Sequence, residues 1–170
     1  MHHDPAPSST APATPERLPP SLAWLALGAF AIGTESFIVA GLLPVLAADL
    51  RISPTHAGQL VLLFALSYAI GSPLMAAACA RFGRRPLLVA SLAAFSGLTL
   101  LASMAQGFGQ LALARLALGL VAGVFVPTAS AVAASLVSPA LRGRALAIVT
   151  ASVPLGAWIA GWGGWRTAYL

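Results

Sequence analysis

Residues 22–48 read LAWLALGAFAIGTESFIVAGLLPVLAA, an apolar run in which Glu35 is the one charged residue. A helix of about 20 residues crosses the hydrocarbon core of a bilayer, so this run is long enough to span a membrane. A carboxylate near the middle of a span costs about 3 kcal/mol unless it is protonated, paired or turned towards a cavity. Charged groups at that depth mark transport or proton pathways, and the position of Glu35 therefore predicts one.

The composition of the whole chain also indicates a membrane protein. Of its 170 residues, 59% are hydrophobic and 8% are charged, and the mean hydropathy is +0.90. In soluble domains about a quarter of the residues are charged. The net charge of +5 comes from nine Arg, because the chain has no Lys. These Arg residues fall between apolar runs and not along one face, so we expect no nucleic-acid partner.

The remaining runs divide the chain into a tail and a membrane domain. Residues 1–20 hold six Pro among small polar residues, which predicts a disordered, Pro-rich cytoplasmic tail. Residues 21–170 are expected to form a transmembrane helical domain. Its spans are predicted at residues 22–48, 57–80, 87–105, 111–137 and 145–161. The fifth is marginal because its roughly 17 residues rise only about 25 Å, so it needs a thinner bilayer or residues 162–165 to complete the crossing.

The distribution of Arg predicts how this domain is inserted. Short cytoplasmic loops of membrane proteins carry an excess of positive residues. One side of the predicted bundle receives Arg17, Arg81, Arg84, Arg85, Arg142 and Arg144, and the other receives Arg51 and Arg166. We therefore expect a multi-pass protein of the cell inner membrane with its N-terminus in the cytoplasm.

Two stretches resemble signatures of a known family of transporters. Residues 33–44 (GTESFIVAGLLP), followed by residues 47–50 (AADL), are similar to the first-helix signature of drug and sugar efflux proton antiporters of the major facilitator superfamily. Residues 81–86 (RFGRRP) resemble the basic half of that superfamily's loop between helices two and three, written G-x-L-x-D-R-x-G-R-R. The residues that match the loop motif are Arg81, Gly83, Arg84 and Arg85.

Other positions match the family in part or depart from it. Residues 115–119 (RLALG) resemble the R-x-x-x-G motif that the family connects with proton coupling, and Pro154 and Gly156 are a remnant of its motif G-x-x-x-G-P-x-x-G-G. Ala76 and Ala80 stand where the loop motif has Gly and Asp. In the family that Asp helps to close the cytoplasmic gate, so the resemblance does not carry this function over.

The resemblance implies an all-α membrane fold. Members of the family have twelve helices in two halves, and each half is built from inverted repeats of three helices. This chain is expected to hold five transmembrane helices and a stub of a sixth at residues 165–170 (WRTAYL), as in an incomplete N-terminal half. The missing helices of a full-length transporter are therefore expected partners.

Glu35 and Arg115 are the two charges inside the predicted spans, and we expect them to form the proton- or substrate-coupling site. Their expected depths differ by about two helical turns, a gap that a long Arg side chain can bridge. Desolvation favours the neutral form of a carboxylate and a nearby guanidinium favours the charged form, so such a pair has two accessible states. Two alternatives stay open: Glu35 stays permanently protonated, or bonds to Thr34 or Ser36, and only packs; or Arg115 extends outwards to the surface.

The other candidates have simpler interpretations. Phe37 and Tyr68 are candidates for lining a solute cavity, although aromatic residues at helical spacing more often only pack. Gly119 and Gly123 form a small-x-x-x-small pattern, which favours close helix packing, and Pro154 predicts a kink near Gly156. The sequence shows no nucleophile with a base and no phosphate-binding loop, so we expect neither an enzyme nor a cofactor. We also expect no metal site, because no ligand set of suitable spacing is present.

The function predicted from these observations is transmembrane transport. Proton entry would drive efflux of a small lipophilic or sugar-like solute through a multi-pass transporter, of which this chain is an N-terminal fragment. The lipid bilayer, the solute and protons are the expected partners. The alternative is a truncated membrane protein that does not transport and associates with other helices. A third possibility is a half-transporter that assembles as a homodimer.

Overall fold

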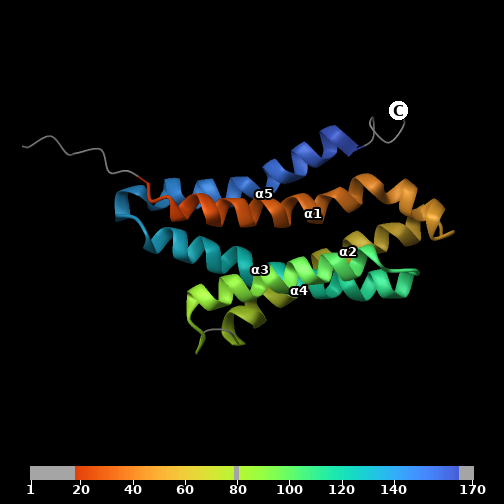
Figure 1. Cartoon of the computed structure of the whole chain (residues 1–170), viewed down its shortest axis with the longest axis horizontal. Coiled ribbons are helices and arrows are strands. Elements are labelled where there is room, and N and C mark those ends of the chain that lie inside the picture. The colour runs from red at the N-terminus through yellow and green to blue at the C-terminus, as the bar shows by residue number, and fades with distance from the viewer. Residues whose placement is uncertain (1–17, 79–80, 165–170) are drawn as a thin grey trace, which may run out of the picture.

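The computed structural model describes residues 18–78 and 81–164 and shows a bundle of long antiparallel helices (Figure 1). The helices are α1 (Ser21–Asp49), α2 (Pro54–Ala78), α3 (Arg84–Ser103), α4 (Phe108–Ser135) and α5 (Arg142–Gly164), with the short 3-10 helix η2 (Pro139–Leu141) before α5. No strand occurs in the part of the chain that the structure describes. The all-α membrane fold expected from the sequence is confirmed.

Four of the described helices have the length and the apolar composition needed to cross a membrane. They are α1, α2 up to Met75, α3 and α4, and their 18-residue windows have mean hydropathies between 1.5 and 2.0. The chain is therefore a multi-pass membrane protein. The crossing of α5 stays a prediction. This helix has 23 residues and rises about 34 Å, since it continues beyond the apolar run to Gly164.

Most helices begin before the apolar runs that predict them. The runs start at residues 57, 87, 111 and 145, whereas the helices start three residues earlier, at Pro54, Arg84, Phe108 and Arg142. Most of these added residues are polar, Pro or Gly, so a search for apolar runs leaves them out. The first backbone N–H groups of a helix have no partner inside it. At α2 the Ser53 Oγ accepts a hydrogen bond from the His56 N–H at 3.2 Å, which satisfies one of these groups.

The turn after α1 ends the helix in a strained backbone conformation. Arg51 has φ 53°, the left-handed region that favours glycine. The Arg51 N–H donates to Ala48 O at 3.3 Å and the Ile52 N–H donates to Ala47 O at 3.0 Å. These two bonds form a Schellman motif, in which the residue after the C-cap is most often Gly. Here Arg51 occupies that position.

The bundle consists of two packed groups. The α1–α5 pair runs side by side along most of its length, and α2, α3 and α4 form the second group (Figure 1). A core of small and branched residues joins the two groups at the end where α1, α3 and α5 begin. It includes Leu25 and Ala29 of α1, Ala129 and Ala133 of α4, and Val149 of α5. Small side chains let helix backbones approach closely inside a membrane.

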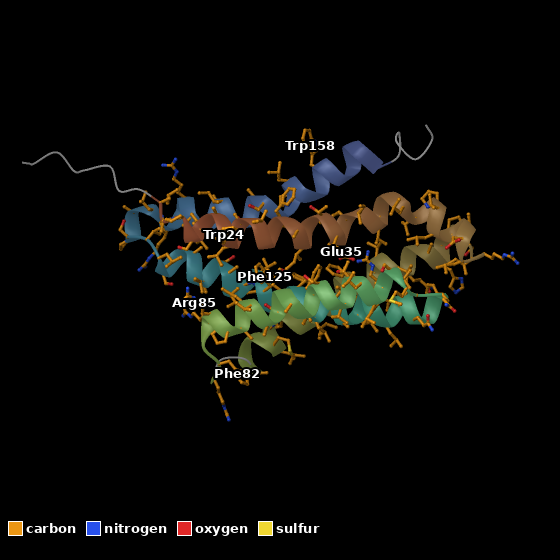
Figure 2. All side chains as sticks on the ribbon, viewed as in Figure 1. Trp24, Glu35, Phe82, Arg85, Phe125 and Trp158 are labelled. Atoms are coloured by element: carbon orange, nitrogen blue, oxygen red, sulfur yellow. The ribbon has the colours of Figure 1, made fainter. Side chains whose placement is uncertain are left out.

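Five arginines gather at this end, which we call the basic end. Arg81, Arg84 and Arg85 lie between α2 and the first turn of α3, and Arg142 and Arg144 lie in the first turn of α5. All five are exposed, and Figure 2 shows Arg85 and Phe82 there. Residues 1–17 of the expected tail, Ala80 and the sixth-helix stub at residues 165–170 lie outside the described residues, and of Ala76 only the backbone is described.

Candidate functional site

Glu35 lies at the centre of α1. It is the fifteenth of 29 residues, so about 21 Å of helix extend from it in each direction. Its side chain is 16% exposed and points towards α4 (Figure 2). The hydroxyls beside it do not bond to it, because Thr34 Oγ1 donates to Phe30 O at 2.9 Å and Ser36 Oγ donates to Ile32 O at 2.6 Å. The alternative in which these neighbours satisfy Glu35 is therefore wrong.

Arg115 of α4 is the partner of Glu35. Its Nη1 lies 3.1 Å from Glu35 Oε1 and 3.3 Å from Oε2, and its side chain is 1% exposed. The ion pair that the sequence suggests is thus present, and Arg115 does not extend outwards to the surface. The helix α4 begins at Phe108. This start places Arg115 seven residues into the helix, about 10 Å from its end and deeper than the apolar run indicates.

The guanidinium of Arg115 has a second neighbour and one unsatisfied group. Its Cζ lies 5.5 Å from the centroid of the Phe64 ring, within the range of cation–π attraction. Its Nη2 is buried and has no hydrogen-bond partner among the described residues. A buried donor without a partner costs free energy, so the surroundings of Arg115 are less than optimal for its full charge. The carboxylate of Glu35 is the negative charge that balances the buried guanidinium.

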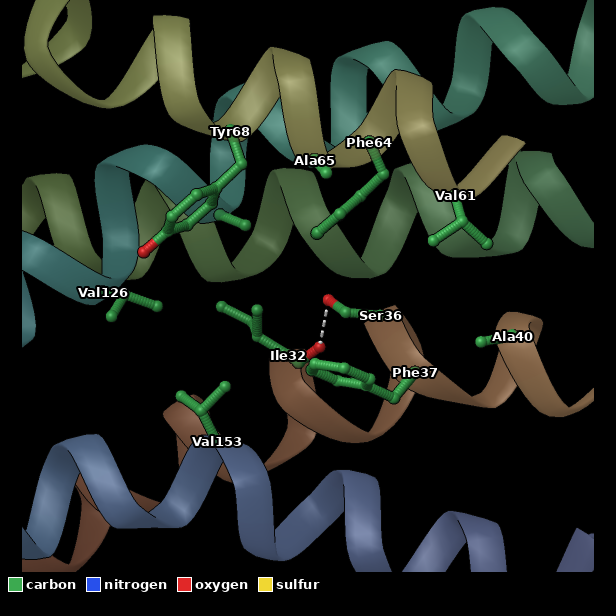
Figure 3. Close-up of a pocket in the computed structure, with 11 residues that line it drawn as sticks. Ile32, Ser36, Phe37, Ala40, Val61, Phe64, Ala65, Tyr68, Val126 and Val153 are labelled. Atoms are coloured by element: carbon green, nitrogen blue, oxygen red, sulfur yellow. Dashed lines mark hydrogen bonds between the residues drawn. The ribbon is translucent and has the colours of Figure 1, made fainter. Parts of the chain in front are cut away.

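A cavity of about 400 Å³ opens beside this pair, between the two helix groups (Figure 3). It is connected to the pair through two residues: Ser36, which follows Glu35, and Phe64, which contacts Arg115. Phe37 and Tyr68, the cavity candidates from the sequence, both line it. The complete lining is Ile32, Ser36, Phe37, Ala40, Val61, Phe64, Ala65, Tyr68, Ala122, Val126 and Val153.

Most of the lining could not be recognised from the sequence. Ile32, Ser36 and Ala40 recur every four residues on α1, and this spacing places them on one face of the helix. Such spacing identifies cavity-lining residues only when a polar or charged residue marks which face of the helix is functional. In α1 apolar residues surround the helix, so the neighbouring Glu35 was the one available marker. Val126 and Val153 carry no marker of this kind.

A close contact between α1 and α4 lies on the basic-end side of the pair. Phe125 of α4 is 3% exposed, and a Cβ placed on Gly28 of α1 would come within 2.5 Å of its Cζ. Figure 2 shows Phe125 between the two helices, on that side of Glu35. Phe125 fits over Gly28 because glycine has no side chain. Neither residue was a candidate from the sequence, since a Phe or Gly in an apolar run usually only packs.

The packing glycines lie where helices touch. A Cβ at Gly119 would come within 2.5 Å of Phe64 O, and one at Gly123 within 3.1 Å of Ser72 N, both on α2. A Cβ at Gly156 of α5 would come within 2.5 Å of Phe30 O of α1 and would also contact Thr34. Pro154 lies inside α5, and this helix bends away from α1 towards its C-terminal end (Figure 1).

The basic loop contributes no side chain to the cavity. Arg81 and Gly83 precede α3, and Arg84 and Arg85 begin it, all at the basic end. Pro86 packs against Gly83, whose added Cβ would come within 3.3 Å of the proline ring. Within residues 18–78 and 81–164, no three His, Cys, Asp or Glu side chains gather in a way that could hold a metal ion.

Comparison with known proteins identifies the family. The profile of the Major Facilitator Superfamily matches residues 25–170. The chain is 37% identical over 153 residues to the uncharacterized MFS-type transporter YbcL of Bacillus subtilis, which covers 85% of this chain and 39% of the relative. It is 35% identical over 154 residues to the inner membrane transport protein YdhP of Escherichia coli K12, covering 86% of this chain and 40% of that protein.

A third relative carries a more specific name. It is the chloramphenicol resistance protein of Streptomyces lividans, 33% identical over 160 residues that cover 89% of this chain and 41% of the relative. This chain thus spans about 40% of the length of the curated relatives that it matches. The helical fold, the signature around Glu35 and these matches agree. The chain belongs to the major facilitator superfamily of transporters and corresponds to an N-terminal portion of such a transporter.

Proposed function

We propose that this chain forms the N-terminal part of a proton-driven exporter. In this proposal Glu35 exchanges the proton, Arg115 adjusts its charge state, and the adjacent cavity receives a small lipophilic or sugar-like solute. The observation that carries the proposal is the ion pair between α1 and α4 in the centre of the helix bundle. It lies next to the cavity, because Ser36 follows Glu35 and Phe64 contacts Arg115, and both of these residues line the cavity.

The ion pair supports proton exchange because it has two distinct states. When Glu35 is ionised, its carboxylate balances the buried guanidinium. When Glu35 takes up a proton, the carboxyl is neutral and Arg115 loses its compensating charge. Breaking a buried pair in this way costs about 3 to 5 kcal/mol, which is enough to favour another arrangement of the helices. Proton binding can thus be linked to a change in the cavity beside the pair.

The direction of transport and the orientation rest on the relatives and on the arginines. One relative is named a chloramphenicol resistance protein, and another an inner membrane transport protein. These names favour efflux of a toxic solute and a location in the inner membrane. The five arginines at the basic end favour placing that end, and with it the N-terminus, in the cytoplasm.

A transport assay in cells tests the proposal. Bacteria that express the chain are loaded with radiolabelled chloramphenicol, with dyes or with sugars, and retention is followed with and without a protonophore. The variant Glu35→Gln removes the ionisable group. Asp49→Asn is the matched control, because it makes the same change at the exposed last residue of the same helix.

We expect the unmodified chain and the Asp49→Asn variant to lower retention of at least one solute, and the protonophore to abolish the effect. Glu35→Gln should retain the solute as cells without the chain do, at equal membrane abundance. No difference between the unmodified chain and empty cells would contradict the proposal and favour a membrane protein that does not transport. Equal efflux by Glu35→Gln would exclude Glu35 as the proton carrier.

A further inference from the structure

The cavity contains two polar side chains, and they differ in what they can bind. The Ser36 hydroxyl already donates its proton to Ile32 O at 2.6 Å, so its oxygen can only accept another hydrogen bond. The Tyr68 phenol has no hydrogen-bond partner among the described residues, and its one recorded interaction is ring stacking with Phe64. Tyr68 is therefore the free donor among the side chains that line the cavity.

The direction of the Tyr68 side chain fits this role. Its ring extends from α2 into the space between α2 and the α1–α5 pair, with the phenol oxygen at its far tip, near Val126 (Figure 3). The ring is held from one side by Phe64, with centroids 6.5 Å apart and planes 17° from parallel. This neighbour limits the directions in which the phenol can point, which lowers the entropy lost when the hydroxyl binds an acceptor.

The rest of the lining sets the character of the solute. Nine of the eleven lining residues are aliphatic or phenylalanine, and the other two are Ser36 and Tyr68. Three rings, those of Phe37, Phe64 and Tyr68, offer flat surfaces on which an aromatic body can stack. No ionised side chain lines the cavity, because Glu35 and Arg115 face each other and are not part of its wall.

We propose that the cavity selects uncharged, mainly aromatic solutes with one hydrogen-bond acceptor, and that the Tyr68 phenol donates a hydrogen bond to this acceptor. The proposal rests on the proposed function in taking the cavity as the solute site, and it narrows the solute class. A sugar would leave several hydroxyls without partners in this cavity, and a small, strongly hydrated cation would lose its hydration without meeting an unpaired carboxylate. Both classes are thereby disfavoured.

Equilibrium dialysis with the purified chain in detergent tests this proposal, with equal detergent on both sides. The probes are a matched pair: the neutral ketone 6-propionyl-2-(dimethylamino)naphthalene, and its 6-propyl analogue without the carbonyl oxygen. The variant Tyr68→Phe removes only the phenol hydroxyl. Ser96→Ala is the control, since it removes a hydroxyl from the exposed face of α3. Ala65→Trp fills the cavity from α2.

We expect Tyr68→Phe to weaken binding of the ketone about three- to tenfold, the contribution of one hydrogen bond, and to leave the propyl analogue unchanged. Ser96→Ala should change neither, and Ala65→Trp should abolish binding of both. A hundredfold excess of sucrose or of ethylammonium should not displace the ketone. Equal effects of Tyr68→Phe on both probes, or displacement by either competitor, would overturn the proposal.

Two further arms keep the test decisive. If Tyr68→Phe does not fold, infrared spectroscopy of the ketone bound to the unmodified chain replaces it: the carbonyl band should lie at lower wavenumber than the band of the ketone in alkane, and an unshifted band would overturn the assignment. If neither probe binds the unmodified chain, the proposal fails. That failure leaves the proton-driven export open, because the effect of Glu35→Gln on efflux in cells tests it separately.

Discussion

At the residue scale one ion pair, between Glu35 and Arg115, lies at the centre of the helix bundle. Glu35 and Arg115 were recognisable in the sequence because charged residues inside apolar runs are costly and rare. Their contact was recognisable only as a hypothesis, because the start of α4 determines the depth of Arg115 and the apolar run does not show that start. The cavity residues Ser36, Val126 and Val153 could not be assigned, since nothing in their own chemistry separates them from packing residues.

The first prediction concerns exchange of the two charges. In the native pair the two charged groups are 3.1 Å apart. Glu35→Arg or Arg115→Glu alone therefore places two like charges next to each other, so each should strongly lower the amount of folded protein in the membrane. The double variant restores a pair and should recover a substantial part of it. Quantitative immunoblots of isolated membranes measure this, and a double variant as poor as the worse single variant would show that the pair does not stabilise the fold.

At the element scale the helices meet through glycines and end in defined turns. The sequence predicts the number and approximate positions of the helices, because each is a long apolar run. It does not predict their first turns, which are polar, or their neighbours, because α1, α2, α4 and α5 are apolar on all sides and show no face that marks a partner. The pairing of α1 with α5 and of α4 with α2 therefore became visible in the structure alone.

The second prediction tests the packing of α4 on α2. Gly119→Ala adds a Cβ that would come within 2.5 Å of Phe64 O, a backbone atom, so the helices must separate and the melting temperature should fall by several degrees. Gly97→Ala is the matched control on α3, where an added Cβ meets nothing within 4 Å. It should be neutral or stabilising, because Ala favours helix over Gly by about 1 kcal/mol. Thermal melts in detergent compare the two, and equal behaviour would contradict close packing at Gly119.

The third prediction concerns the turn that follows α1. Arg51 has φ 53°, where a residue with a Cβ is strained and glycine is not. Arg51→Gly should therefore stabilise the protein by about 1 kcal/mol, and Arg51→Val should destabilise it by a similar amount or more. The midpoint of denaturation reports both changes. A loss of stability in Arg51→Gly would mean that the Arg51 side chain contributes more than its backbone strain costs.

At the scale of the whole molecule, two helix groups enclose the candidate site. The α1–α5 pair and the α2–α3–α4 group meet through the core near the basic end, the Phe125–Gly28 contact and the Glu35–Arg115 pair. The ion pair is the contact of these three that a single proton can change. The sequence predicted a membrane bundle and its family, but not this division, because the division depends on which helices pack together.

The fourth prediction concerns orientation in the membrane. In a Cys79→Ala background, single cysteines are placed at Gly143, at the basic end, and at Gln106, in the exposed turn between α3 and α4 at the opposite end. A membrane-impermeant maleimide added to intact cells should label Gln106→Cys and not Gly143→Cys, because the arginine excess favours the cytoplasm for the basic end. Permeabilised cells, in which both should react, provide the control. The reverse pattern would invert the proposed topology.

The central claim is that solute in the cavity and the proton on Glu35 are linked. Proton exchange on solute binding tests it most directly: the purified chain in weakly buffered detergent is mixed with saturating ketone probe while a pH indicator records proton uptake or release. We expect a proton signal from the unmodified chain and from Asp49→Asn, and none from Glu35→Gln that still binds the probe. Binding without any proton signal, or an equal signal from Glu35→Gln, would contradict the claim.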